Sequence, residues 1–407
     1  MPESKSPHVD LVVTGAAELL TCAEDASDLI GLIPGGGVAI SGGRIVAVGD
    51  VSGYRADRVI DAQGGVIMPG FVDSHTHVVF GGSRVDEYAA KVSGQTPPAG
   101  VPVGITGTVA TTRAATAEQL LQESSARVRE MVNSGTTTLE SKSGYGLDSK
   151  HELRLLETSQ RLAKTMPADI VSTYLGAHAF PADVEQDRYV DEVVDLIPEV
   201  AERGLAEFCD VYCDEGYFDL AQTARILSAG LDAGLKPKLH LDAYGHTGAA
   251  AIAIELGAVS VDHLNFTKDA ELRALGDAGI AGVYMPCLEY SVAHSRPLDP
   301  RRVIDAGMEL ALATDICPGC WVTDMQLAVA MACRTGGLSV AQALRAATHG
   351  SARALGRQES VGSLKVGMQA DVIVLDVARH EDVAYRIGRN AVTTVIARGA
   401  VVEGFLT

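Results

Sequence analysis

The chain has 407 residues, of which 47% are hydrophobic and 21% charged, a balance that is typical of a globular enzyme and excludes a largely disordered protein. Its 52 acidic and 33 basic residues give a formal net charge of −19 with no basic cluster, so neither nucleic acid nor an anionic membrane is an expected partner. We find no membrane-length apolar run and no secretory signal, and the 7 scattered cysteines argue against a disulfide framework, so a cytoplasmic protein is expected.

The first part of the chain contains short strand-like runs separated by glycine-rich turns, and the same pattern of short runs and glycines occurs near its end. The runs cover residues 9–14, 37–40, 44–48 and 58–61, and then 370–376 and 392–402. We expect the two ends to pair into one small, discontinuous β-sandwich domain made of residues 1–65 and 358–407.

Between these ends, apolar strand-like runs alternate with amphipathic helical stretches, which is the pattern of repeated βα units on a parallel sheet. The expected strands cover residues 66–72, 136–140, 170–174, 208–212, 237–241, 259–262, 282–285 and 310–314. Helices are expected at residues 117–133, 150–164, 187–202, 221–233 and 269–278. Eight such units predict an α/β fold of the (β/α)8 TIM-barrel type over residues 66–357.

Ionisable residues follow the expected strands directly, where barrel enzymes build their active sites. Five of the 11 histidines lie at these strand ends, namely His75, His77, His178, His240 and His263. The sequence therefore predicts an active site at the mouth of the barrel.

Three of these histidines and one aspartate form a candidate metal site. His75 and His77 are two apart at the end of a strand, so their side chains share a face and can chelate one ion. His240 closes the fifth expected strand and Asp315 the eighth. Three imidazoles and a carboxylate predict one divalent metal with a position open for water, zinc being the expected ion and iron, cobalt or manganese also compatible. The alternative is a set of ordinary buried polar groups.

Two of the strand-end residues are candidates for moving protons. We expect His263 to orient the attacking water or to stabilise the oxyanion, and Asp315 to accept the water proton and return it to the leaving nitrogen. A hydrogen-bonded structural role is the alternative for His263.

Five further motifs are HTHVVFGGSR from His75, TVATTR from Thr108, SKSGYGL from Ser141, LGAH from Leu175 and VGSLKVG from Val361. With them, the chain resembles the imidazolonepropionase family of amidohydrolases over nearly its whole length. The resemblance implies a homodimer with one zinc or iron per chain. It also implies hydrolysis of the ring amide of imidazolone propionate, a small carboxylate-bearing substrate of histidine degradation, to formiminoglutamate.

The resemblance further implies three substrate-binding residues, Arg84, Tyr145 and His178. A guanidinium suits a carboxylate, so Arg84 is expected to meet the propionate group. Helix capping or a surface ion pair is the alternative for Arg84, and packing or second-layer support is the alternative for the other two.

The chain differs from the family pattern at positions that are expected to contact the substrate and determine its identity. Ala243 stands where the family has Glu or Gln, the segment from Cys317 to Cys320 replaces Asn-Pro-Gly-Ser, and Pro97 replaces a tyrosine. Tyr244 and His246 are candidates to replace a lost contact. The cysteine pair is expected to line the pocket, with redox or metal chemistry as the alternative.

Because of these differences, a second activity is an alternative. In it, the same metal chemistry acts on another lactam, a hydantoin-like ring or an aminated heterocycle. A third possibility is a non-catalytic scaffold, against which the intact set of four ligands and His263 counts.

Overall fold

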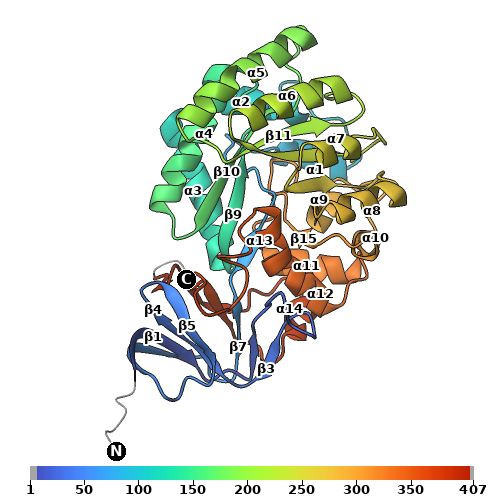
Figure 1. The fold of residues 1–407 in the computed structure, drawn as a ribbon. Helices are drawn as coiled ribbons and strands as arrows, with labels where there is room; N and C mark the ends of the chain where they lie inside the picture. The colour runs from blue at the N-terminus through green and yellow to red at the C-terminus, as the bar shows by residue number, and fades with distance from the viewer. Residues whose placement is uncertain (1–6, 404–407) are drawn as a thin grey trace, which may run out of the picture.

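Two small β-sheets, which contain strands from both ends of the chain, lie below a larger α/β barrel in the view of Figure 1. This computed structural model describes residues 7–403. No helix among those residues is long and apolar enough to cross a membrane.

The first small sheet has the strand order β5-β4-β1-β6 and is built from the N-terminal part alone. Its strands are β1 (His8–Thr14), β4 (Gly37–Ser41), β5 (Arg44–Gly49) and β6 (Arg55–Asp61). The second sheet has the order β18-β17-β16-β7-β2-β3. Its strands are β2 (Glu18–Leu20), β3 (Leu32–Pro34), β7 (Val66–Pro69), β16 (Val372–Leu375), β17 (Val392–Ala397) and β18 (Ala400–Val401).

The expected pairing of the two ends occurs in the second sheet, where β16 runs antiparallel to β7. Buried side chains from both sheets, such as Val13, Val38, Ile67 and Val372, form one apolar core between them. The residue limits of the two domains stay a prediction.

The larger sheet confirms the predicted (β/α)8 barrel, because its eight strands are parallel and follow one another in chain order. They are β8 (Phe71–Asp73), β9 (Thr136–Lys142), β10 (Asp169–Ala177), β11 (Phe208–Cys213), β12 (Lys236–Leu241), β13 (Ser260–His263), β14 (Ala281–Tyr284) and β15 (Leu310–Leu312). The segments that follow the first and last strands close the ring, since the Asp315 amide donates to the His75 carbonyl at 3.1 Å.

The prediction of one strand over residues 66–72 is wrong. The chain changes sheets at Pro69 and Gly70, so β7 belongs to the small domain's sheet and β8 to the barrel. Gly70 packs against the neighbouring barrel strand so closely that a Cβ there would lie 2.2 Å from the Thr137 hydroxyl. Only glycine fits this corner without displacing its neighbour.

All five predicted helices are confirmed, with ends that differ by one residue at most. They are α3 (Ala117–Asn133), α4 (Ser149–Thr165), α5 (Gln186–Glu202), α6 (Leu220–Asp232) and α8 (Asp269–Asp277). Their starts carry the signals that favour a helix; for example, the Thr116 side chain caps α3 in a capping box with Gln119.

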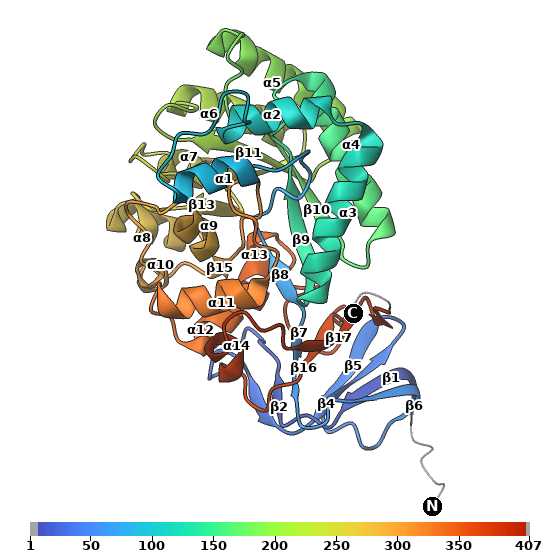
Figure 2. The same cartoon turned by 180° about the vertical axis from the view of Figure 1, so that it is seen from behind.

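The remaining helices were not predicted, and most are short. They are α1 (Val85–Val92), α2 (Gly104–Ala114), α7 (Ala250–Glu255), α9 (Pro286–Ser291), α10 (Pro300–Asp305), α11 (Met325–Arg334), α12 (Val340–Arg345), a π-helical turn (Ala346–Gly350), α13 (Ser351–Ala354) and α14 (Glu381–Tyr385). Figure 2 shows α1 and α2, which follow β8, on the part of the barrel away from the small sheets.

Candidate functional site

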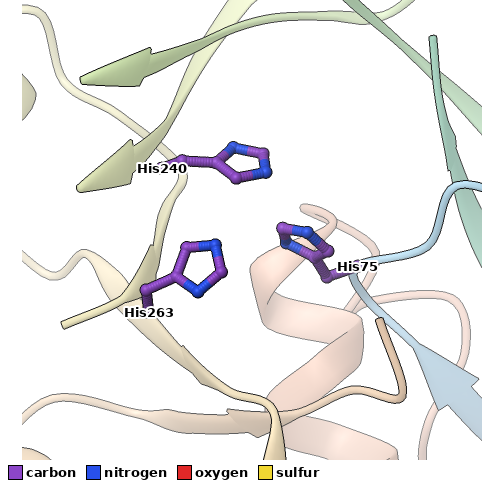
Figure 3. Close-up of side chains that lie close together, drawn as sticks. All are labelled: His75, His240 and His263. Atoms are coloured by element: carbon purple, nitrogen blue, oxygen red, sulfur yellow. The ribbon is translucent and has the colours of Figure 1, made fainter. Parts of the chain in front are cut away.

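Five ionisable side chains from four barrel strand ends converge on one place. His75 and His77 follow β8, His240 lies in β12, His263 ends β13 and Asp315 follows β15. Figure 3 shows the rings of His75, His240 and His263 turned toward a common space. The ring centroid of His75 is 4.6 Å from that of His240 and 5.7 Å from that of His263.

The possible ligand atoms fall into two overlapping groups that share His75. In one group, the ligand atoms of His75, His240 and His263 lie within 4.8 Å of one another. In the other, the Nε2 atoms of His75 and His77 are each 3.7 Å from Asp315 Oδ1. The structure thus gathers all four sequence-predicted metal ligands around His75 and also brings His263 into reach.

Two buried aspartates hold the imidazoles in orientation. His75 donates from Nδ1 to Asp262 Oδ2 at 2.7 Å, and His240 donates from Nδ1 to Asp210 Oδ1 at 3.1 Å. A carboxylate bound to one ring nitrogen keeps the proton there and leaves the other nitrogen free to bind a metal. Sequence reasoning did not single out either aspartate.

The atoms left facing the centre lack partners. Among the described residues, the buried Nε2 atoms of His75 and His240 and the Oδ1 atom of Asp315 have no hydrogen-bond partner. Buried polar atoms are costly when unpaired, and such a group converging on one point indicates a cation site. Nitrogen and carboxylate donors of this kind suit zinc, iron, cobalt or manganese.

The electrostatics of the cluster favour neutral imidazoles. Burial lowers the pKa of His75, His77 and His240 well below the ordinary value, and the nearby positive charge of Lys142 lowers each further. Burial also raises the pKa of Asp315 well above its usual range, although Lys142 opposes that shift. Neutral imidazole is the form that binds a metal ion, and a cation beside Asp315 would favour its ionised form.

A layer of fully buried charged side chains lies next to these ligands. It consists of the ammonium groups of Lys142 and Lys238 and the carboxylates of Glu140, Asp210 and Asp262. Asp315 and the buried Asp73 also lie within electrostatic range, so carboxylates outnumber the two ammonium groups in this part of the barrel. A cation beside Asp315 would offset this excess of negative charge.

The backbone is strained at two of the converging residues. Asp315 has a φ of 50° and His263 a φ of 80°, which are left-handed conformations that residues other than glycine rarely adopt. Such strain is retained where surrounding structure requires it, and it concentrates at functional sites.

Two of the three sequence-predicted substrate residues lie against the metal-ligand group. The His178 ring stacks on His77 at a centroid distance of 4.9 Å, and its Nδ1 donates to the Gly144 carbonyl at 3.1 Å. The Tyr145 ring is 5.5 Å from His77. Burial lowers the pKa of His178 to about 4, so this ring is neutral at physiological pH.

The third substrate residue, Arg84, lies farther out. It lines a cleft of about 400 Å³ together with Tyr88, Gly319 and Trp321. Its guanidinium also forms a bidentate ion pair with Glu87, a residue that the sequence reasoning did not consider. The ion-pair alternative for Arg84 is therefore present, and the side chain still faces the cleft.

The departures from the family pattern are mostly buried near this site. Ala243 is 1% exposed, and its carbonyl accepts a hydrogen bond from His294 Nε2 at 2.9 Å. His246, a candidate to replace the lost contact, is instead bound to Glu271 at 2.8 Å. The Tyr244 ring lies 5.0 Å from that of His294.

The two cysteines after Asp315 face each other across a tight turn. The amide of each donates to the carbonyl of the other at 3.0 Å, and both thiols are free and buried. Pro97 lies in the segment between α1 and α2.

Comparison with known proteins places this architecture in a family. Residues 66–402 match the model of the amidohydrolase family. The imidazolonepropionase of Geobacillus kaustophilus is 43% identical, with 97% of this chain and 95% of the relative covered. That of Halobacterium salinarum is 39% identical, with 97% of this chain and 98% of the relative covered.

Solved structures share the fold at much lower identity. An adenosine deaminase from Xanthomonas campestris with bound zinc has a TM-score of 0.75 at 20% identity, and the alignment covers 97% of this chain and 93% of that one. An N-isopropylammelide isopropylaminohydrolase from Burkholderia multivorans has a TM-score of 0.71 at 18% identity, with 97% and 98% covered. The chain belongs to the amidohydrolase family and, within it, is a homologue of curated imidazolonepropionases.

Proposed function

We propose that this chain is a metal-dependent hydrolase that opens the ring amide of 4-imidazolone-5-propanoate to give N-formimino-glutamate. The observation that carries the proposal is the buried cluster of His75, His77, His240 and Asp315 at the mouth of the barrel, in which three of the facing atoms, those of His75, His240 and Asp315, have no hydrogen-bond partner. Curated imidazolonepropionases at about 40% identity over nearly the full length support the substrate.

These four residues would hold one divalent metal, with zinc expected and iron as the alternative. Bound there, the metal would supply Lewis-acid activation of water at neutral pH. The homodimer and the cytoplasmic location stay predictions.

The chain's own side chains would carry the proton transfers. Asp315 would accept the proton of the attacking water and deliver it to the leaving nitrogen. His263 would orient that water or stabilise the oxyanion; burial lowers its pKa to about 4, so it would act as a neutral imidazole.

Three residues would hold the substrate. Tyr145 and His178 lie beside His77 and are placed to contact a ring bound next to the metal. Arg84, at the cleft, would bind the propionate carboxylate. The cleft and the ligand cluster would thus contact opposite ends of one small molecule.

A second candidate substrate class is favoured by a specific observation. Ala243 is buried without a polar side chain, and the thiols of Cys317 and Cys320 are weaker hydrogen-bonding groups than an amide and a hydroxyl. These residues suit a different lactam, a hydantoin-like ring or an aminated heterocycle.

A substrate panel separates the two candidates. Purified protein loaded with zinc is assayed against imidazolone propionate, cyclic ureides, lactams and aminated heterocycles. We expect turnover of imidazolone propionate that a chelator abolishes and added zinc restores. Turnover of another ring without turnover of imidazolone propionate would establish the second candidate, and a protein that binds no metal and hydrolyses nothing would support a scaffold.

A further inference from the structure

Lys142 occupies the centre of the buried charge layer. Its side chain, which projects from β9, is 0% exposed. The Nζ atom lies 2.6 Å from Asp210 Oδ2, 3.2 Å from Asp262 Oδ2 and 3.1 Å from Glu140 Oε2. Three carboxylates from three strands surround this ammonium group; the contact with Asp210 is a hydrogen bond, and those with Glu140 and Asp262 are ion pairs.

Two of the carboxylates that face Lys142 also hold metal-ligand histidines. Asp262 Oδ2 lies between Lys142 Nζ and His75 Nδ1, which is 2.7 Å away. Asp210 uses both of its oxygens: Lys142 Nζ donates to Oδ2 at 2.6 Å, and His240 Nδ1 donates to Oδ1 at 3.1 Å. One lysine therefore touches the carboxylate partners of two imidazoles that come from opposite parts of the barrel.

A second lysine, Lys238, provides an internal comparison. It is also 0% exposed and also pairs with Glu140, at 2.8 Å. Its other hydrogen bond goes to the Ser74 carbonyl at 3.2 Å. Among the described residues, its ion pairs and hydrogen bonds do not include Asp210 or Asp262, so it shares the burial and charge of Lys142 but not the contact with the histidine partners.

We propose that Lys142 is a positioning residue of the metal centre. It fixes the Asp210 and Asp262 carboxylates, and through them it holds His240 and His75 with their Nε2 atoms toward the metal. This inference rests on the metal centre of the proposed function. Such a role goes beyond balancing charge, because Lys238 balances charge in the same layer without touching either aspartate.

The test compares Lys142→Met with Lys238→Met, which remove one buried charge each and keep a side chain of similar length. Zinc affinity is measured by competition with a chromophoric chelator, and the ligand geometry by the visible absorption of the cobalt-loaded protein. We expect Lys142→Met to raise the zinc Kd by about 10- to 100-fold and to change the cobalt spectrum. Lys238→Met should keep both properties, with a Kd within about threefold of the wild type.

Loss of a buried charge can prevent folding, so a charge-balanced pair is also needed. Glu140→Gln/Lys142→Met removes one positive and one negative charge, and its reference is Glu140→Gln alone. If Lys142→Met alone does not fold, the comparison of the double variant with Glu140→Gln tests the role of Lys142. The zinc Kd of the double variant should be at least about 10-fold higher than that of Glu140→Gln.

Two results would overturn the proposal: unchanged zinc affinity and cobalt spectrum on loss of Lys142, or an equal loss in Lys238→Met. A wild-type protein that binds neither zinc nor cobalt stoichiometrically would instead contradict the metal centre itself. The two failures are therefore distinguishable without a turnover assay.

Discussion

The guanidinium of Arg84 is held by the carboxylate of Glu87 through two parallel contacts, from Nε to Oε2 at 2.5 Å and from Nη2 to Oε1 at 2.9 Å. Glu87 also accepts a hydrogen bond from the Gly104 amide at 3.1 Å, which ties the pair to the start of α2. The remaining nitrogen, Nη1, is the guanidinium atom nearest the Cβ position of Gly319 in the wall of the cleft. Glu87 thus determines which edge of Arg84 is left to meet a substrate carboxylate.

We predict that Glu87→Gln weakens substrate binding more than it slows the chemistry. The amide keeps the shape of the side chain but loses the charge that fixes Arg84, and hydrogen bonds to charged groups contribute about 1.5–3 kcal/mol. The KM for imidazolone propionate should rise about 10-fold or more, with kcat within about threefold. Glu199→Gln, which alters an exposed pair with Arg203, is the control. An unchanged KM would contradict this role.

A second prediction concerns whether His263 binds the metal. Its ring nitrogen lies within 4.8 Å of the ligand atoms of His75 and His240, so geometry alone allows it to be a ligand. In the proposed roles it contacts the water instead. His263→Asn should then lower kcat about 10²- to 10⁴-fold while zinc affinity stays within about threefold, and His240→Asn should lower both. Equal losses of zinc affinity in the two variants would make His263 a ligand.

The sequence sufficed to predict the barrel and the position of the site, for a physical reason. The C-terminal ends of parallel strands meet at one edge of the barrel, so residues at or just after those ends, such as His75, His240 and Asp315, must come together. The two-residue spacing of His75 and His77 also indicated that they share a face.

Other features could not be predicted because they depend on contacts between distant segments. Asp210 and Lys238 lie inside strands and Lys142 ends one. A charge in a strand ordinarily argues against burial, and only the closed barrel shows that Lys142 pairs with Asp210 and Lys238 with Glu140. The change of sheet at Pro69 and Gly70 leaves the apolar pattern unbroken, so it resembles one continuous strand.

A third prediction addresses the cysteine pair after Asp315. Burial raises the pKa of all seven cysteines, and the thiolate is the reactive form. We therefore expect iodoacetamide at neutral pH to leave Cys317 and Cys320 unmodified in the native protein, with only the partly exposed Cys333 reacting slowly. Mass spectrometry should show seven modified cysteines after denaturation, and no native modification in Cys333→Ser.

Rapid native labelling of Cys317 or Cys320, or a disulfide between them, would support the redox alternative. Absence of native labelling at both cysteines would support a role as pocket lining.

The last prediction concerns Glu289 in α9. The side chain is 8% exposed, and its Oε1 accepts hydrogen bonds from Asn265 Nδ2 at 2.5 Å and from the Leu298 amide at 2.9 Å. Burial raises its pKa to about 7, although these two hydrogen bonds oppose the shift. The protonated carboxyl is therefore the form that the fold favours.

The sign of the pH effect follows from which state binds more protons. Between the unfolded pKa of about 4.3 and the folded pKa of about 7, the native state holds the proton and the unfolded state does not. The free energy of unfolding therefore falls as the pH rises through this window. The stability that depends on the protonated Glu289 carboxyl is fully present below the window and lost above it. Glu289→Gln keeps the Oε1 acceptor and cannot ionise, so it should not show this loss.

Urea unfolding of both proteins between pH 4.5 and 8 measures the effect. The stability of the wild type relative to Glu289→Gln should fall by an amount on the order of 3 kcal/mol across the range, because a pKa shift of one unit corresponds to about 1.4 kcal/mol. Taking the difference between the two proteins removes the contribution of every group that titrates equally in both. A difference that stays flat with pH would show that Glu289 is ionised in the folded protein, and a rise with pH would mean that its hydrogen bonds outweigh its burial.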